Sequence, residues 1–197
     1  MIPYQQFPSS QDPGSSITGI NTTLIHQKTF QKPPLSREVL DQMIIDHQEF
    51  LFNGGAGGMW KTLLIKGIVT GIYQHLDIKE GKQAHFEHLH LDSKLSFKSV
   101  ELPFANFCCA YAIGVDFSES DLSYTLMTDA MLTNANFSSA ILNNVDFSRS
   151  NLKGASFVNA NCAGADFENC NLEGADFRGA RVDSARFPGA RLEGVIV

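Results

Sequence analysis

The chain contains 197 residues, of which 43% are hydrophobic and 18% are charged, and its net charge is −6. A chain of this length accommodates one or two domains. No apolar stretch approaches the roughly 18 residues that a membrane-spanning helix needs, so the sequence excludes a transmembrane helix.

Residues 1–34 are rich in Ser, Gln, Thr and Pro and contain few apolar residues. They lack the basic start and the apolar core of a secretory signal peptide. We therefore predict a flexible polar arm over this range.

Residues 35–83 are predicted to form an N-terminal capping region that begins with a helix over about residues 36–52. Ser36 is suited to cap the helix, with the acidic Glu38 and Asp41 near its positive end. The apolar stripe at helical spacing consists of Val39, Leu40, Met43, Ile44, His47, Phe50 and Leu51. Within this stripe we interpret His47 as a packing residue and not as a ligand.

The chain after this helix contains a glycine-rich segment and two apolar runs. Asn53 and Gly54 are expected to end the helix, and "GGAGG" (54–58) is expected to act as a hinge. The segment "WKTLLIKGIVTGIYQ" predicts two short strands. "GGAGGMWK" lacks the spacing of a phosphate-binding loop, so we expect no nucleotide site here.

A period of five residues dominates the second half of the sequence. From Phe97 to Val197 every fifth residue is apolar, and the residue two places before it is nearly always Ala, Val or another small residue. This period is too long for a strand and does not fit a helical turn. Two residues in each five therefore point inward and three face water, with Gly recurring at the turns.

The repeats "GADFE", "NLEGA", "ADFRG" and "NLKGA" resemble the A(D/N)LXX repeat of the pentapeptide-repeat family over roughly residues 95–197. The resemblance implies an all-β solenoid, a right-handed quadrilateral parallel β-helix of about five coils, here with an N-terminal helix-containing cap. Four sides would stack Phe97, Phe117, Phe137, Phe157 and Phe177 in one column. The opposite column would contain Phe107, Phe147, Phe167 and Phe187.

The repeat also extends upstream, so the predicted β-helix covers residues 84–197. Ala84, Phe86, Leu89 and Leu91 keep the inward spacing, but six residues instead of five separate Leu91 from Phe97. We predict about half a coil there, ending in a one-residue bulge. A stack of repeats needs a cap on its apolar end.

A histidine-rich segment is the one candidate for metal binding or catalysis. His75, His85, His88 and His90 lie near Glu87 and Asp92, and such residues can hold zinc. An enzyme or metal binder that uses this region is an alternative, but we expect surface histidines, no catalytic residues, no metal and no cofactor.

The four cysteines lack the spacing of a metal site. Cys162 and Cys170 lie at inward positions, whereas Cys108 and Cys109 point outward. A disulfide scaffold is not indicated, and the pattern favours a reducing, cytoplasmic location.

Several outward positions carry large apolar residues in place of polar ones. The candidates for partner binding are Phe104, Tyr111, Ile113, Tyr124, Leu126 and Met131, and Ile141 breaks the same rule. By their spacing, Tyr111, Ile113 and Met131 share one side with Leu126 beside them, and Phe104 stacks on Tyr124. Either the cap covers this patch or a protein partner does.

The family resemblance also implies a DNA-mimicking protector or inhibitor of DNA gyrase or topoisomerase as an alternative. The candidate phosphate mimics are Asp116, Asp121, Asp146, Asp166 and Asp176. From residue 95 onward there are twelve acidic and seven basic residues. Five coils about 4.8 Å apart span about 24 Å, over which DNA carries roughly 14 charges, so the net charge density is about a third of that of DNA. Arg178, Arg181, Arg186 and Arg191 form a basic collar, whose positive charge is opposite to that of the DNA backbone.

The chain ends in "RLEGVIV", still in the repeat, which predicts a homodimer through the C-terminal coil. The interface would contain Phe187, Leu192, Val195 and Val197. The favoured role is a non-catalytic scaffold that binds a protein partner of unknown identity, without direct nucleic-acid binding. One form of it is a bacterial effector whose polar arm is a secretion signal.

Overall fold

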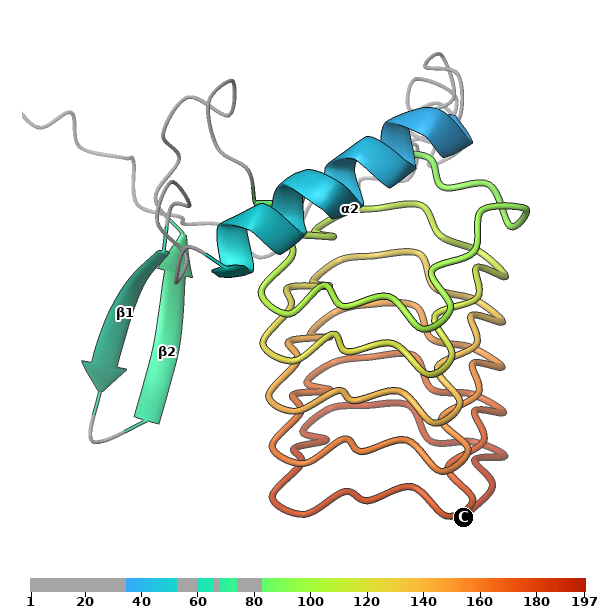
Figure 1. Ribbon diagram of the computed structural model, residues 1–197. Helices are drawn as coiled ribbons and strands as arrows, with labels where there is room; N and C mark the ends of the chain where they lie inside the picture. Colours follow the sequence, from blue (N-terminus) through green and yellow to red (C-terminus); the bar gives the residue numbers. More distant parts are fainter. Residues whose placement is uncertain (1–34, 53–59, 66–67, 74–82) are drawn as a thin grey trace, which may run out of the picture. The chain divides into compact units, whose positions relative to one another are not determined.

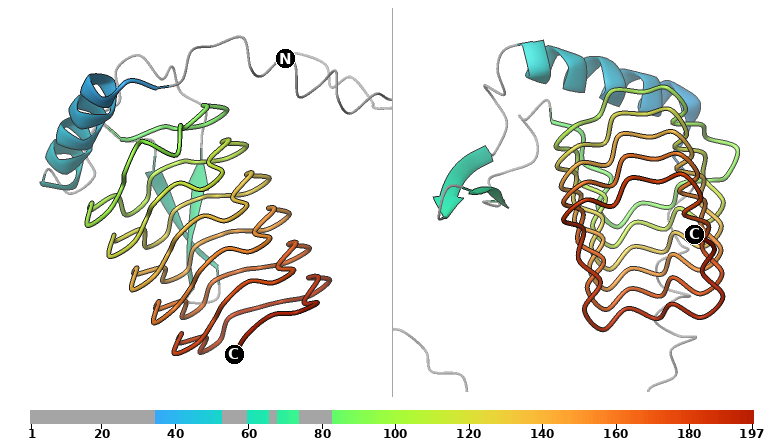
Figure 2. Two further views of the ribbon diagram at one scale, coloured as in Figure 1. Left: turned by 90° about the vertical axis from the view of Figure 1, so that its right-hand side faces the viewer. Right: turned by 90° about the horizontal axis from the view of Figure 1, so that it is seen from below.

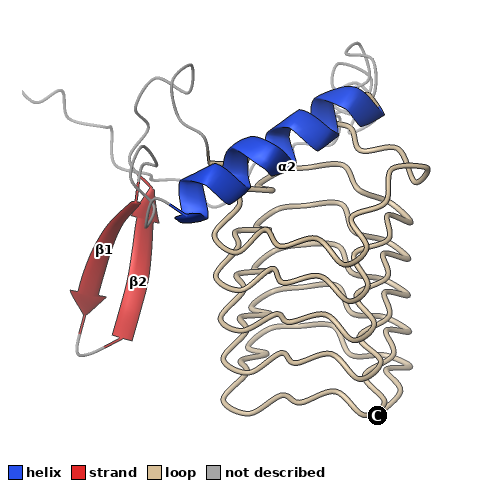
Figure 3. Ribbon diagram, viewed as in Figure 1, coloured by secondary structure: helices blue, strands red, loops and turns tan. Residues whose placement is uncertain are grey.

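The computed structural model describes residues 35–52, 60–65, 68–73 and 83–197, all within one compact unit, Lys32–Val197. It contains helix α2 (Arg37–Phe52), two strands, β1 (Trp60–Ile65) and β2 (Ile68–Tyr73), and a long stack of coils (Figures 1 and 3). The predicted polar arm 1–34 and the predicted hinge 54–58 lie outside the described residues.

The stack is held together by parallel bridges between residues 20 positions apart. Ser96 pairs with Asp116, which pairs with Asn136, and the same step continues along the chain. A step of 20 residues equals four pentapeptides, which confirms the expected four-sided coil. Figure 2 shows the successive coils superimposed along one axis, as in a β-helix solenoid.

Each pentapeptide turns a corner immediately after its central apolar residue. The backbone N–H three residues after the centre donates to the carbonyl of the centre, as in Ala105 to Leu102 (3.2 Å) and Ala140 to Phe137 (3.1 Å). The residue two places after the centre has a positive φ, for example +66° at Gly114. A turn of this kind needs a left-handed third residue, which explains the recurring glycines.

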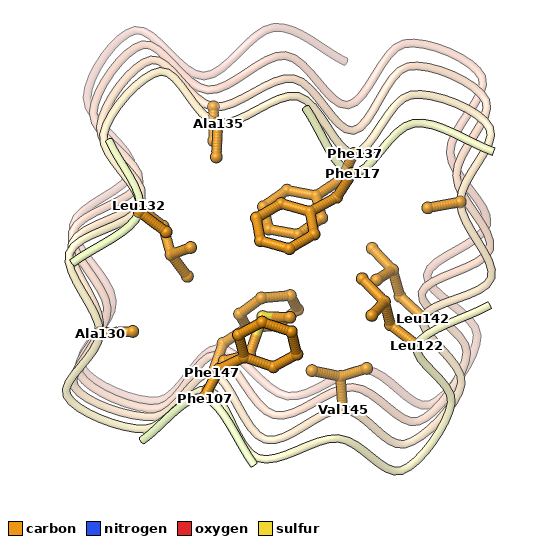
Figure 4. Close-up of a cluster of buried hydrophobic side chains, with 14 of the residues drawn as sticks. Phe107, Phe117, Leu122, Ala130, Leu132, Ala135, Phe137, Leu142, Val145 and Phe147 are labelled. Carbon is orange, nitrogen blue, oxygen red and sulfur yellow. The ribbon is translucent and has the colours of Figure 1, made fainter. Parts of the chain in front are cut away.

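Two columns of phenylalanine rings fill the interior. Successive rings of the first column, from Phe97 to Phe177, lie 4.5–5.2 Å apart. In the opposite column Phe147, Phe167 and Phe187 stack at 5.1 and 4.9 Å. Figure 4 shows the two columns facing each other, with leucines on the other two sides. Both predicted columns are confirmed, and Met127 occupies the buried position between Phe107 and Phe147.

The predicted one-residue slip is present within the first coil, between His90 and Ser96. His85 pairs with Asn106 and His90 with Tyr111, both 21 residues apart, whereas Ser96 onward keeps a step of 20. Ala84, Phe86 and Leu91 are nevertheless buried in the same core. We refer to residues 84–104 as the first coil, 105–124 as the second and 125–144 as the third.

Helix α2 contacts the first coil through one face. The Ser36 hydroxyl accepts a hydrogen bond from the Val39 N–H (3.4 Å), as expected for an N-cap. Leu40 is fully buried in the core cluster that contains Phe86, and Met43 and Ile44 pack against it. Val39, which we assigned to the apolar stripe, is 50% exposed.

Strands β1 and β2 form an antiparallel hairpin in which Trp60 pairs with Tyr73 and Ile65 with Ile68. The two predicted strands are therefore confirmed. The apolar and β-branched residues in both segments favour strands.

Candidate partner-binding surface

The outward residue just before each central apolar residue has a structural role in most coils. Where it is Asp or Asn, its side-chain oxygen accepts the backbone N–H two residues later. Examples are Asp121 with the Ser123 N–H (2.9 Å) and Asn136 with the Ser138 N–H (3.1 Å). Such a bond satisfies a turn donor that the ladder between coils leaves unpaired.

All five candidate phosphate mimics make this local bond. Asp116, Asp121, Asp146, Asp166 and Asp176 accept the N–H of the residue two places on at 2.9–3.0 Å. Asp166 also forms an ion pair with Arg186 (2.9 Å), and Asp176 forms one with Arg178 (2.6 Å). These carboxylates therefore have a structural explanation that needs no resemblance to phosphate.

The arginines of the basic collar each lie close to an acid. Besides the two pairs above, Arg181 contacts Asp183 (3.2 Å) and Arg191 contacts Glu173 (3.8 Å). Asp146, Asp166 and Arg186 lie in one column, because Asp146 pairs with Asp166 and Asp166 pairs with Arg186. Because these side chains are exposed, the pairs contribute little stability, but they reduce the net charge of the surface.

One group of apolar candidates lies at the corner that follows Leu102 and Leu122. The rings of Phe104 and Tyr124 stack with centroids 5.2 Å apart and an interplanar angle of 13°, which confirms the expected stacking. Leu126 follows Tyr124 by two residues and pairs with Asn106 and Asp146. Along the chain, its column therefore lies between this corner and the column of Tyr111 and Met131. We call Phe104, Tyr124 and Leu126 the corner cluster.

The corner cluster contains backbone strain that sequence reasoning missed. Phe104 has a φ of +69° and Tyr124 a φ of +59°, at a position where lower coils carry Asn144 and Gly164. Bulky residues rarely adopt this conformation, because their Cβ approaches the following carbonyl. The signal that could have revealed the strain is their place two residues after a repeat centre.

A second group, Tyr111, Ile113 and Met131, lies on the next face. Tyr111 pairs with Met131, and the His90 ring meets the Tyr111 ring edge-on at 5.0 Å. In the coil after Met131, polar residues occupy these positions: Asn151 pairs with Met131, and Lys153 lies 40 residues after Ile113. Ile141, 42% exposed, pairs with Asp121 and Asn161 and so belongs to neither group.

The structure separates the candidate metal-binding histidines. His85 and His90 pair with Asn106 and Tyr111 on adjacent faces, and His88 lies 3.6 Å from Glu87. His75 is outside the described residues. Within the described part of the chain, no group of three His, Cys, Asp or Glu residues is placed to hold a metal ion.

The four cysteines are free thiols. Burial raises the pKa of Cys162 and of Cys170 to about 12, as expected for core residues. Burial also raises the pKa of Cys108, whose sulfur lies 3.1 Å from the Thr128 hydroxyl. A raised pKa keeps a thiol protonated and makes it a poor nucleophile.

The last coil leaves apolar side chains accessible. Leu192 is 50% and Val197 95% exposed, and Val182 and Ile196 are also exposed. Of the remaining candidate dimer residues, Phe187 and Val195 are half-buried against the core.

No helix in the described ranges is long and apolar enough to cross a membrane.

Comparison with known proteins identifies the repeat. A family model described as a pentapeptide repeat region matches residues 128–196. A pentapeptide repeat protein from the thylakoid lumen of Arabidopsis thaliana is 32% identical, over 49% of this chain and 68% of that chain, with a TM-score of 0.49. None of the curated protein sequences matches this chain.

Two further solved structures match a similar share of the chain. The pentapeptide repeat protein Rfr23 from the cyanobacterium Cyanothece 51142 is 31% identical, over 49% of this chain and 63% of that chain, with a TM-score of 0.43. QnrB1, a plasmid-mediated fluoroquinolone resistance protein, is 20% identical, over 54% of this chain and 69% of that chain, with a TM-score of 0.31.

Proposed function

Because this chain belongs to the pentapeptide-repeat family, we propose that it is a non-catalytic scaffold that binds a protein partner through apolar side chains on its first three coils. The main support for this proposal is that three outward positions just before a repeat centre hold apolar residues in place of the Asp or Asn that stabilises the turn. Leu126, Met131 and Ile141 have no oxygen to accept the N–H two residues on, whereas Asp or Asn makes that bond in neighbouring coils.

The corner cluster supports the proposal most strongly. A left-handed backbone costs a residue with a Cβ roughly 1–2 kcal/mol, and both Phe104 and Tyr124 bear this cost. Residues that reduce the stability of a fold without filling its core are typical of binding sites. Tyr and Phe are also enriched at the centres of protein interfaces.

The architecture in detail is part of the proposal. We infer a right-handed β-helix of about five coils over residues 84–197, with residues 35–83 as its cap. The support for a cap is the burial of Leu40 in the core cluster and the hydrogen bonds from α2 to the first coil. The free thiols favour a cytoplasmic location.

The decisive experiment compares binding with stability. The variant Phe104→Asn/Tyr124→Asn removes both rings and installs a residue that tolerates a positive φ, as Asn144 already does in the same column. We expect its melting temperature to stay level or rise, while a partner captured by the wild type from a lysate of the source organism is lost.

A matched pair of charge variants tests the neighbouring face. Tyr111→Glu/Met131→Glu and Asn151→Glu/Asn171→Glu add the same charge to one column, in its upper and lower coils respectively. Loss of capture in the upper variant alone supports the proposed surface. Equal capture by all three variants and the wild type would refute it.

The last coil supports a second part of the proposal, a homodimer. Exposed Val182, Leu192, Ile196 and Val197 offer an apolar surface that a second copy would cover. Leu192→Glu should then convert a dimer into a monomer in light scattering. A monomeric wild type at micromolar concentration would contradict it.

A further inference from the structure

His47 joins helix α2 to the first coil through both ring nitrogens. The ring is fully buried, and its Nδ1 accepts the Ala84 N–H at 3.0 Å. Its Nε2 lies 2.9 Å from the carbonyl oxygen of Pro103 and donates to it, because a carbonyl can only accept. The two bonds attach one side chain of α2 to the start and to the end of the first coil.

This arrangement requires a neutral imidazole. Protonation would give the ring a second N–H, on Nδ1, directed at the N–H of Ala84, so the bond would be replaced by a contact between two donors. Burial of the ring also disfavours its charged form. We propose that His47 is a pH-sensitive latch, whose protonation in mild acid releases helix α2 from the first coil.

Burial and the nearby His85 lower the pKa of His47, whereas its bond to the Pro103 carbonyl raises it. From the first coil, His85 is the titratable residue that acts on it, and a second positive charge there opposes protonation of His47. The ring of Phe50 lies 5.4 Å away. On α2 itself, Asp46 bonds with Gln42 at the helix surface, and Glu49 is exposed.

Burial lowers the pKa of His47 from 6.5 to about 4. Because the docked ring binds a proton more weakly than a released one, docking is fully favoured above about pH 6.5 and weakens progressively towards pH 4. If the released ring keeps its ordinary pKa, the ratio of released to docked helix rises about 30-fold between about pH 7.5 and pH 5.

Release would uncover apolar surface at the end of the β-helix. Leu40 and Phe86 are both fully buried and belong to one core cluster, against which Met43 and Ile44 pack. This inference depends on the contacts of α2 alone, and it holds whether or not the side surface binds a partner.

Hydrogen–deuterium exchange of the full-length protein tests the latch. After correction for the intrinsic exchange rate, we expect the protection of the α2 amides and of the Ala84 N–H to fall about 30-fold from pH 7.5 to pH 5. Amides of the lower coils, such as Asn151 to Ala165, should keep their protection and serve as the internal reference.

Two histidine substitutions assign the effect. His47→Gln should abolish the pH dependence, whereas His88→Gln, on an exposed histidine of the first coil, should retain it. Unchanged α2 protection in the wild type, or pH dependence that persists in His47→Gln, would overturn the proposal. Loss of the dependence in His85→Gln alone would overturn it as well and identify His85 as the switch.

A direct titration covers the case in which His47→Gln does not dock at neutral pH. In wild-type protein, nitrogen chemical shifts should show His47 as the neutral Nε2–H tautomer at pH 7.5. A protonated His47 ring in a helix that stays docked at pH 5 would refute the latch.

Discussion

Gly154 and Gly174 lie in one column, one coil apart, and differ in what lies above them. Both have left-handed backbones, with φ of +67° and +68°. A Cβ added to Gly154 would come closer than 3.0 Å to Oδ1 of Asn134, while a Cβ added to Gly174 would meet nothing within 4 Å. The pair therefore separates backbone strain from a side-chain clash.

The expected magnitudes follow from this geometry. Alanine at either site costs about 1–2 kcal/mol for the left-handed conformation. At Gly154, Asn134 must also leave its rotamer, which adds about 1 kcal/mol. In a domain of this size, 1 kcal/mol corresponds to a melting temperature lower by about 2–4 °C.

Thermal denaturation followed by circular dichroism measures the difference. We expect Gly154→Ala to melt below Gly174→Ala by about 2–4 °C. Combining Gly154→Ala with Asn134→Gly removes the clash and should bring the cost back to that of Gly174→Ala. Equal melting of the two single variants would show that Asn134 moves aside freely and would refute the reasoning.

Two further predictions concern buried and turn-forming polar groups. The hydroxyl of Thr125 is buried without a hydrogen-bond partner in the described part of the chain, and Val145 occupies the same inward position one coil below. Thr125→Val should therefore raise the free energy of unfolding by about 1 kcal/mol, measured in urea, and a loss of stability would contradict it. Asp146→Ala loses two bonds to Ser148 and should cost about 1–2 kcal/mol, whereas Asp146→Asn keeps the backbone bond and should cost less than about 0.5 kcal/mol. Asp146→Asn also tests the alternative of gyrase protection, since in a supercoiling assay with a topoisomerase poison it should abolish protection only if the charge imitates phosphate.

Much of the fold could be predicted because a solenoid repeats one local rule. The apolar period of five, the two phenylalanine columns and the slip after Leu91 all follow from spacing along the chain. Each repeat contacts mainly the repeats above and below it, so sequence distance translates directly into spatial distance. The two strands and the helix also follow from local patterns, but the pairing of the strands was not predicted.

The candidate surface was less predictable, since outward residues look interchangeable in sequence. Leu126 was expected beside the side of Tyr111 and Met131, and its column also contains Asn106 and Asp146. The five aspartates look like a free acidic surface until their bonds to the backbone are known. The strain at Phe104 and Tyr124 comes from their left-handed backbone. An aromatic residue type does not by itself indicate that conformation.

The sequence by itself determined the inward and outward positions of residues 84–197, because the core is built from a periodic set of side chains. The four sides of the coil came from the resemblance of the repeats to a known family. Only the tertiary structure decided how helix α2 meets the first coil. His47 bonds to Ala84 and Pro103, which are 37 and 56 residues away. No sequence period connects these positions, since the hydrogen bonds of His47 depend on how the helix and the first coil pack against each other.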